Sequence, residues 1–95
     1  AEKEDISHRL QGSFYRHKVE MEIQLKLIES YESQIKTGKQ TLDLLYNDYA
    51  NSGENFEEVL RLQQQLIEYQ KMKVKALVAY YVAEAQINHL TAKFH

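Results

Sequence analysis

The chain contains no cysteine and no proline. Without cysteine there is no disulfide framework and no thiol chemistry, although this absence does not fix the cellular compartment. Proline is the residue that removes a helical N–H group and clashes with the preceding turn of a helix. Long helices are therefore compatible with the whole sequence.

Long apolar runs and an excess of one charge are also lacking. The longest apolar run, Ala76 to Ala83, has eight residues and ends at Glu84, whereas a membrane-spanning helix needs roughly 20. Twelve basic and fourteen acidic residues leave a net charge of −2. This balance provides neither a basic patch for nucleic acid nor a Lys/Arg cluster for a membrane surface. We therefore expect no nucleic-acid partner and no membrane-spanning segment.

Catalytic and metal-binding motifs are scarce. The four histidines lack the four-residue separation of a helical zinc site; they are His8, His17, His89 and His95. A di-iron helical bundle needs repeated Glu-x-x-His motifs, and the nearest matches are Asp5–His8 and Gln86–His89, the second without a carboxylate. There is no glycine-rich phosphate loop, and an open pair of helices offers no enclosed pocket. We expect no enzyme activity, no cofactor and no metal.

The clearest turn signal lies in residues 49–63, YANSGENFEEVLRLQ. A run of small turn residues ends at Gly53, which can adopt positive φ without steric cost. Asn55 is a candidate helix N-cap, and the Glu58 carboxylate lies where it could reach back to the N–H group of that cap. We therefore expect the chain to fold back on itself at Gly53.

Apolar residues on both sides of this turn alternate at spacings of three and four, which indicates a coiled coil. We predict an all-α fold, a long antiparallel two-helix coiled-coil hairpin, with helices over about 6–50 and 55–92 and a turn over 51–55. The residues with this spacing, here called the seam, are Leu10, Phe14, His17, Met21, Gln24, Ile28, Tyr31, Ile35, Gly38, Leu42, Leu45 and Tyr49 on the first helix. On the second helix they are Val59, Leu62, Leu66, Tyr69, Lys73, Leu77, Tyr80, Glu84 and Ile87.

Each predicted helix has a second apolar line beside the seam. The two lines are Ile23, Leu27, Thr41 and Leu44 on the first helix, and Leu60, Ile67, Val74 and Tyr81 on the second. A helix in a two-stranded coiled coil needs only one narrow seam, so the second lines stay exposed to water on a single hairpin. We expect other copies, or further helices of a longer parent protein, to cover them.

Two glycines interrupt the first helical pattern. Gly12 and Gly38 each cost about 1 kcal/mol relative to alanine inside a helix. We interpret them as a bend or a close contact between helices. The alternative is that one helix ends at Gly38 and another begins at Lys39, although no proline or strong cap supports that break.

The segment around the turn resembles the outer-membrane efflux proteins, the TolC family. Their helical repeats carry an aromatic residue, a short turn with glycine, an apolar residue, an acidic residue followed by Val-Leu, and a Gln- or Ala-rich helix. The corresponding positions here are Tyr49, Gly53, Phe56, Glu58-Val59-Leu60 and Gln63. The resemblance covers about residues 6–94 and is greatest to the branch that exports heavy metals and other cations. Gly53 lies one position later than the family glycine, and Glu54 stands where some members have a basic gating residue.

This resemblance implies that the chain is a fragment of a larger protein, the periplasmic portion of a homotrimeric bacterial outer-membrane channel. Such hairpins line a tunnel through which drugs or metal cations leave the cell. Their turns form the periplasmic tip, where a periplasmic adaptor protein docks and connects the channel to an inner-membrane pump. By this resemblance, the tip comprises Tyr49, Asn51, Ser52, Gly53, Glu54, Asn55 and Glu58.

Two other functions remain open from the residues. A coiled-coil module for dimerisation or protein interaction, with no transport role, explains the seam equally well. It gives no reason for the second apolar lines or for the particular turn segment. A metal-dependent helical-bundle enzyme would need carboxylate–histidine pairs that the sequence lacks.

Overall fold

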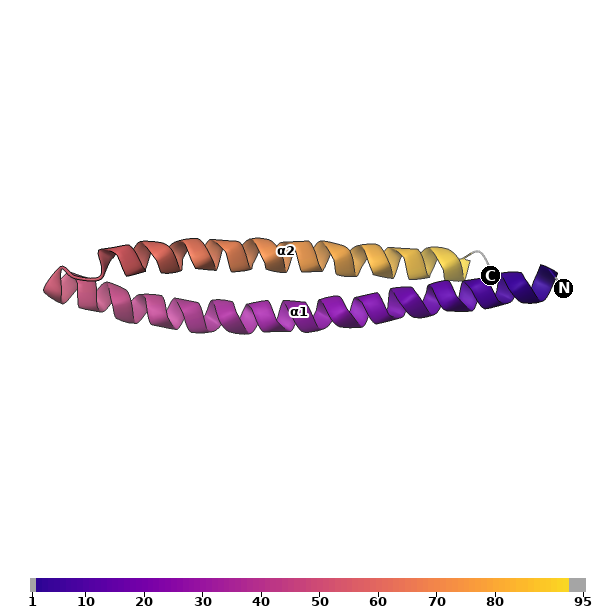
Figure 1. The fold of residues 1–95 in the computed structure, drawn as a ribbon, viewed down its shortest axis with the longest axis horizontal. Helices are drawn as coiled ribbons and strands as arrows, with labels where there is room; N and C mark the ends of the chain where they lie inside the picture. Colours follow the sequence, from indigo (N-terminus) through magenta and orange to yellow (C-terminus); the bar gives the residue numbers. More distant parts are fainter. Residues whose placement is uncertain (1, 93–95) are drawn as a thin grey trace. The chain divides into compact units, whose positions relative to one another are not determined.

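The computed structural model describes residues 2–92, with the side chains of residues 8–92. Helix α1 spans Glu2–Ser52 and helix α2 spans Phe56–Ala92, and the two form a hairpin (Figure 1). The predicted all-α hairpin is confirmed. The turn is shorter than predicted, because α1 extends through residues 51 and 52. His95 and the side chain of Asp5 lie outside the described parts of the chain.

The chain divides into two compact units. The turn unit is residues 28–75, and the terminal unit combines residues 1–27 with residues 76–95. Across the described residues, neither helix contains a stretch that is both long and apolar enough to cross a membrane.

In the turn unit, the predicted seam is the buried face. Ile28, Val59 and Leu66 are 6%, 3% and 6% exposed. The other seam positions from Tyr31 to Leu45 and from Leu62 to Lys73 are half-buried, which confirms the predicted periodicity. The exception is Tyr49 at the edge of the turn, which is exposed.

Two cross-helix contacts stabilise this seam. The rings of Tyr31 and Tyr69 lie 6.3 Å apart. Lys73, a charged residue at a seam position, places its Nζ 3.3 Å from an Oε of Glu32. The aliphatic stem of a lysine can cover apolar surface while its charged end remains at the edge. This explains how a charged residue occupies a position that the pattern assigns to the core.

In the terminal unit, two alanines are the most deeply buried residues. Ala76 is 4% exposed and Ala83 is 3% exposed. The sequence pattern missed both, because an alanine side chain adds little to an apolar line of larger residues. Most predicted seam residues in this unit are half-buried, whereas Phe14 is exposed.

Helix α1 continues through both of its glycines, so the alternative break at Gly38 is wrong. A Cβ atom added at Gly38 would lie 2.5 Å from Cδ2 of Leu66, which is far inside normal van der Waals contact. A Cβ added at Gly12 would have no such neighbour within 4 Å. The close contact between helices is therefore confirmed at Gly38 and does not occur at Gly12.

The second apolar lines are exposed, as predicted. In the turn unit, Leu60, Ile67 and Val74 of α2 are 43%, 50% and 57% exposed, and Leu44 of α1 is 70% exposed. In the terminal unit, Ile23 and Tyr81 are also exposed. A single hairpin leaves this surface in water because each helix can bury only one face on its partner.

Candidate functional site: the turn and its flanking residues

The turn begins with a left-handed cap on α1. Gly53 has a φ of +73°, and its N–H group donates a hydrogen bond of 2.8 Å to the backbone oxygen of Tyr49. This bond satisfies one of the carbonyl groups that a helix end leaves without a partner. The positive φ expected at Gly53 is confirmed. A side chain at this position would strain the backbone.

Asn55 starts α2, but not in the way that the sequence suggested. Its backbone oxygen accepts the first helical hydrogen bond, from the N–H group of Val59 at 3.1 Å. Its side-chain Nδ2 donates to the carboxylate of Asp48, so the side chain is used across the turn rather than as an N-cap. The described residues show no hydrogen bond between Glu58 and the N–H group of Asn55. The predicted capping box is therefore wrong.

Asn55 also has a φ of +72°, which makes it the second left-handed residue of the turn. Asparagine tolerates this conformation better than most residues with a Cβ atom. The sequence contained a signal for this positive φ. Apart from glycine, asparagine is among the residues that most often adopt the left-handed conformation. An N-cap requires an extended backbone, so the two roles of Asn55 compete.

Asp48 holds the turn from the α1 side, and the sequence reasoning missed it. Its carboxylate accepts the hydrogen bond from Asn55, and its backbone oxygen accepts one of 2.8 Å from the Ser52 hydroxyl. The Ser52 Oγ in turn accepts a 3.2 Å hydrogen bond from the N–H group of Glu54. A network of short polar side chains thus fixes the turn.

An aromatic pair flanks the turn. The rings of Tyr49 and Phe56 lie 5.6 Å apart with an interplanar angle of 38°. Tilted pairs at this distance are favourable. The two residues nevertheless remain 38% and 53% exposed. Further from the tip, the side chain of Gln63 donates a hydrogen bond to the hydroxyl of Tyr46.

The structure brings most of the predicted tip residues together. Tyr49, Ser52, Gly53, Glu54 and Asn55 belong to the hydrogen-bonded turn and its aromatic pair. Asn51 and Glu58 are exposed residues beside it. Asp48 and Phe56 complete the set.

The surface around the turn is acidic. Residues 40–60 contain no Lys, Arg or His and five carboxylates, all on exposed residues: Asp43, Asp48, Glu54, Glu57 and Glu58. The remainder of the chain has the other nine acidic residues and all twelve basic residues. The turn therefore presents carboxylates and two partly exposed aromatic rings beside a hydrogen-bonded backbone.

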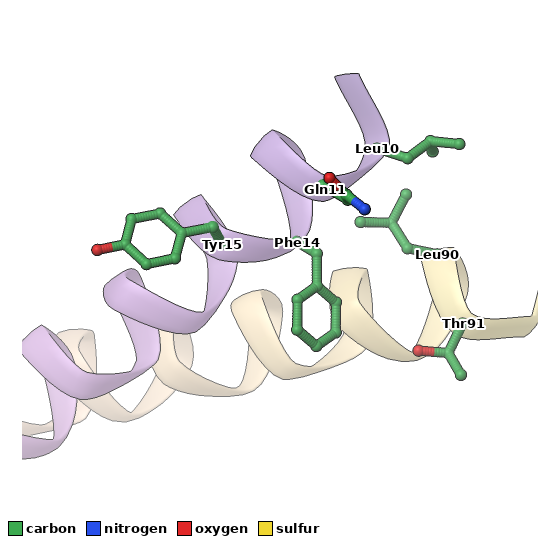
Figure 2. Close-up of a pocket in the computed structure, with 6 residues that line it drawn as sticks. All are labelled: Leu10, Gln11, Phe14, Tyr15, Leu90 and Thr91. Atoms are coloured by element: carbon green, nitrogen blue, oxygen red, sulfur yellow. The ribbon is translucent and has the colours of Figure 1, made fainter. Parts of the chain in front are cut away.

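The terminal unit has an apolar hollow of about 410 Å³, lined by Leu10, Gln11, Phe14, Tyr15, Leu90 and Thr91. Figure 2 shows Phe14 pointing toward the ribbon of α2, whereas Tyr15 extends away from Leu90. The hollow is open to solvent, and none of the described residues that line it is an acid, a histidine or a lysine. The described lining is mostly apolar, with Gln11 and Thr91 as its polar side chains.

Among the described side chains, no three His, Asp or Glu residues lie where they could hold a metal ion together. The acidic residues of the turn are spread over its surface and do not converge.

Comparison of the chain with protein-family models, with curated proteins and with solved structures gave no match.

Proposed function

We propose that this chain is a tunnel-forming hairpin from the periplasmic portion of a bacterial outer-membrane efflux channel of the TolC type. In this role it is a passive part of the conduit for drugs or metal cations. The full-length protein is a homotrimer. Its turn is the periplasmic tip, where an adaptor protein docks and links the channel to an inner-membrane pump.

The turn carries this proposal. The residues that resemble the family, Tyr49, Gly53 and Phe56, are those that build the turn: the aromatic pair flanks it and the glycine caps α1. The turn is exposed, yet hydrogen bonds hold it through Asp48 and Asn55. A protruding tip that must fit a partner benefits from such order, because less conformational entropy is lost on binding.

The exposed second apolar lines support the tunnel over a simple coiled-coil module. A two-stranded module would leave residues such as Ile67 and Val74 in water at 50% and 57% exposure. In a tunnel wall, each hairpin has neighbours on both sides, and these residues become contacts between hairpins.

The test is site-specific photo-crosslinking in the cell that makes the full-length protein. A photoreactive residue replaces Ser52, which is exposed at the turn, and a second variant carries the probe at the exposed Glu29 as the control. We expect the Ser52 probe to link to a periplasmic adaptor protein. The Glu29 probe, far along α1, should give only links within the channel.

Two results would overturn the proposal. One is a Ser52 probe that is displayed efficiently but links only to copies of its own chain. The other is a link to cytoplasmic helical proteins, which would favour the coiled-coil interaction module.

A further inference from the structure

In the turn unit, the second apolar line of α2 is an exposed aliphatic surface. Its members there, Leu60, Ile67 and Val74, are 43%, 50% and 57% exposed. They repeat every seven residues and therefore share one face of the helix. The α1 helix in this unit has a single exposed aliphatic residue, Leu44, so within residues 28–75 only α2 presents such a line.

A hollow lies on this face of α2. It has a volume of about 440 Å³ and is lined by Ile67, Gln70, Lys71, Val74 and Lys75, all on the one helix. These residues are separated by one, three and four positions, which is the spacing of the four residues that surround a knob in coiled-coil packing. The hollow therefore suits an apolar side chain that projects from a second helix.

The charge beside the hollow is positive. Residues 69–83 contain three lysines and no acidic residue. Lys73 forms its ion pair across the seam, whereas Lys71 and Lys75 line the hollow. Among the described side chains, only Glu68 lies within ion-pairing distance of Lys71, at 3.6 Å, and no carboxylate lies so close to Lys75. Exposed pairs of this kind contribute little, so both ammonium groups can bind carboxylates of a partner.

We propose that this face of α2 docks an amphipathic helix whose aliphatic line is flanked by carboxylates. An aliphatic side chain of that helix enters the hollow between Ile67 and Val74. Two acidic residues one helical turn apart on its flank meet Lys71 and Lys75, which are themselves four residues apart. The inference rests on the proposed function only in treating the second apolar line as an interface. It goes further by stating the chemistry of the helix that covers this line.

The apolar contact and the charges have different roles. Burial of half-exposed aliphatic side chains supplies most of the affinity. The lysines decide which helices fit, because a partner with basic residues on its flank would place like charges together. The separation of Lys71 and Lys75 also sets the register, since one helical turn spans about 5.4 Å along the axis.

Two other occupants fit this surface less well. A second α2 line would bring the lysines of both copies to one contact, where they repel each other. A helix that binds a membrane surface is rich in Lys and Arg on its polar face. Outside the apolar line, α2 instead also carries Glu57, Glu58 and Glu68.

Two synthetic helical peptides test the charge preference. Both have three heptads with leucine at positions a and d. They differ only at the flanking positions, which are glutamate in one peptide and lysine in the other. Fluorescence anisotropy measures their binding to the natural chain. We expect the glutamate peptide to bind about tenfold more tightly at about 50 mM salt, and less than about threefold more tightly at about 0.5 M salt, because salt screens exposed charges.

Charge-reversal variants provide the matched control. Lys71→Glu/Lys75→Glu should invert the preference, so that the lysine peptide binds more tightly. Lys36→Glu/Lys39→Glu makes the same change in net charge on α1, outside the hollow, and should keep the preference for the glutamate peptide. Circular dichroism should show both variants folded, because all four lysines are exposed. Equal binding of the two peptides to the natural chain, or an unchanged preference in Lys71→Glu/Lys75→Glu, would overturn the proposal.

Photo-crosslinking identifies the natural occupant. A photoreactive residue replaces Val74, which is 57% exposed, in the full-length protein and in the cell that makes it. Mass spectrometry then sequences the linked peptides. We expect links to a segment that differs in sequence from this chain and has an aliphatic line at helical spacing, with acidic residues four positions apart beside it. Links to copies of this chain, to lipid or to a segment without such acidic residues, or no link at all, would contradict the docking helix.

The probes at Val74 and Ser52 separate the two proposals. An adaptor link at Ser52 together with a lipid link at Val74 would leave the proposed function standing and overturn the docking helix. A link from Val74 to an acid-flanked helix, without an adaptor link at Ser52, would leave the docking helix standing and remove the efflux role.

Discussion

The side chain of Leu66 on α2 fills the space beside Gly38 on α1, where a side chain at position 38 would lie. A Cβ atom at Gly38 would lie 2.5 Å from Cδ2 and 3.3 Å from Cγ of Leu66, and Leu66 itself is only 6% exposed. The leucine side chain therefore fills the position that any larger residue at 38 would need. The glycine weakens α1 locally, and the close packing of Leu66 offsets that loss.

Replacing Gly38 with alanine should not give the stabilisation that alanine gives elsewhere in a helix. The gain in helix propensity is about 1 kcal/mol. The clash with buried Leu66 costs about 1–3 kcal/mol, because overpacked side chains must leave their preferred rotamers. We expect Gly38→Ala to lower the urea midpoint measured by circular dichroism.

The control for this prediction is Gly12→Ala, where the added methyl group meets no neighbour within 4 Å. That variant should be stabilised by about 0.5–1 kcal/mol. Combining Gly38→Ala with Leu66→Val should recover part of the loss. Equal stabilisation by Gly38→Ala and Gly12→Ala would show that Leu66 leaves room for a methyl group at position 38.

Substituting Gly53 tests the left-handed cap. Its φ of +73° is accessible to valine only with strain, so Gly53→Val should destabilise the hairpin by more than about 1 kcal/mol. Thermal melting followed by circular dichroism measures the effect. Gly12→Val, within a regular helix, should have no comparable cost, and an unchanged melting curve for Gly53→Val would rule out the observed turn.

The hydrogen bond between Asn55 and Asp48 needs one amide donor and one carboxylate acceptor, so exchanging the two side chains should preserve it. Asn55→Asp places two carboxylates next to one another and removes the donor, and should cost about 1–2 kcal/mol. The exchange variant Asp48→Asn/Asn55→Asp restores a donor facing a carboxylate and should recover most of the loss. The free energies of unfolding in urea of the natural chain, Asn55→Asp, Asp48→Asn and the exchange variant together form a double-mutant cycle. If the exchange variant is no more stable than Asn55→Asp, the side chains do not interact.

Lys73 offers a stabilising substitution at the seam. Its ion pair with Glu32 is half exposed, and such pairs contribute about 0–1 kcal/mol. Leucine at this half-buried position adds apolar burial, so Lys73→Leu should raise stability by about 1 kcal/mol. The stability of the natural chain should fall slightly in 1 M salt, and that of Lys73→Leu should not. A loss of stability in the leucine variant would show that the ion pair contributes more than the apolar contact.

Much of this fold could be predicted from the sequence because both of its main signals are periodic or local. The three-four spacing that includes Ile28, Leu66 and even Gly38 identified the buried seam. Gly53 identified the reversal of the chain. The alanines at 76 and 83, which are 4% and 3% exposed, were missed because a small side chain contributes little to a hydrophobic pattern.

The sequence by itself determined the two helices, the place where the chain reverses, and the presence of a second apolar line on each helix. These depend on interactions within a few turns of one helix, and local spacing specifies them. The tertiary structure alone decided the details of the turn. Asn55 binds Asp48 instead of capping α2 because the fold brings residues seven positions apart within hydrogen-bonding distance. It likewise decided that Gly38 serves a contact with Leu66, since only the antiparallel pairing of α1 with α2 places these two residues side by side.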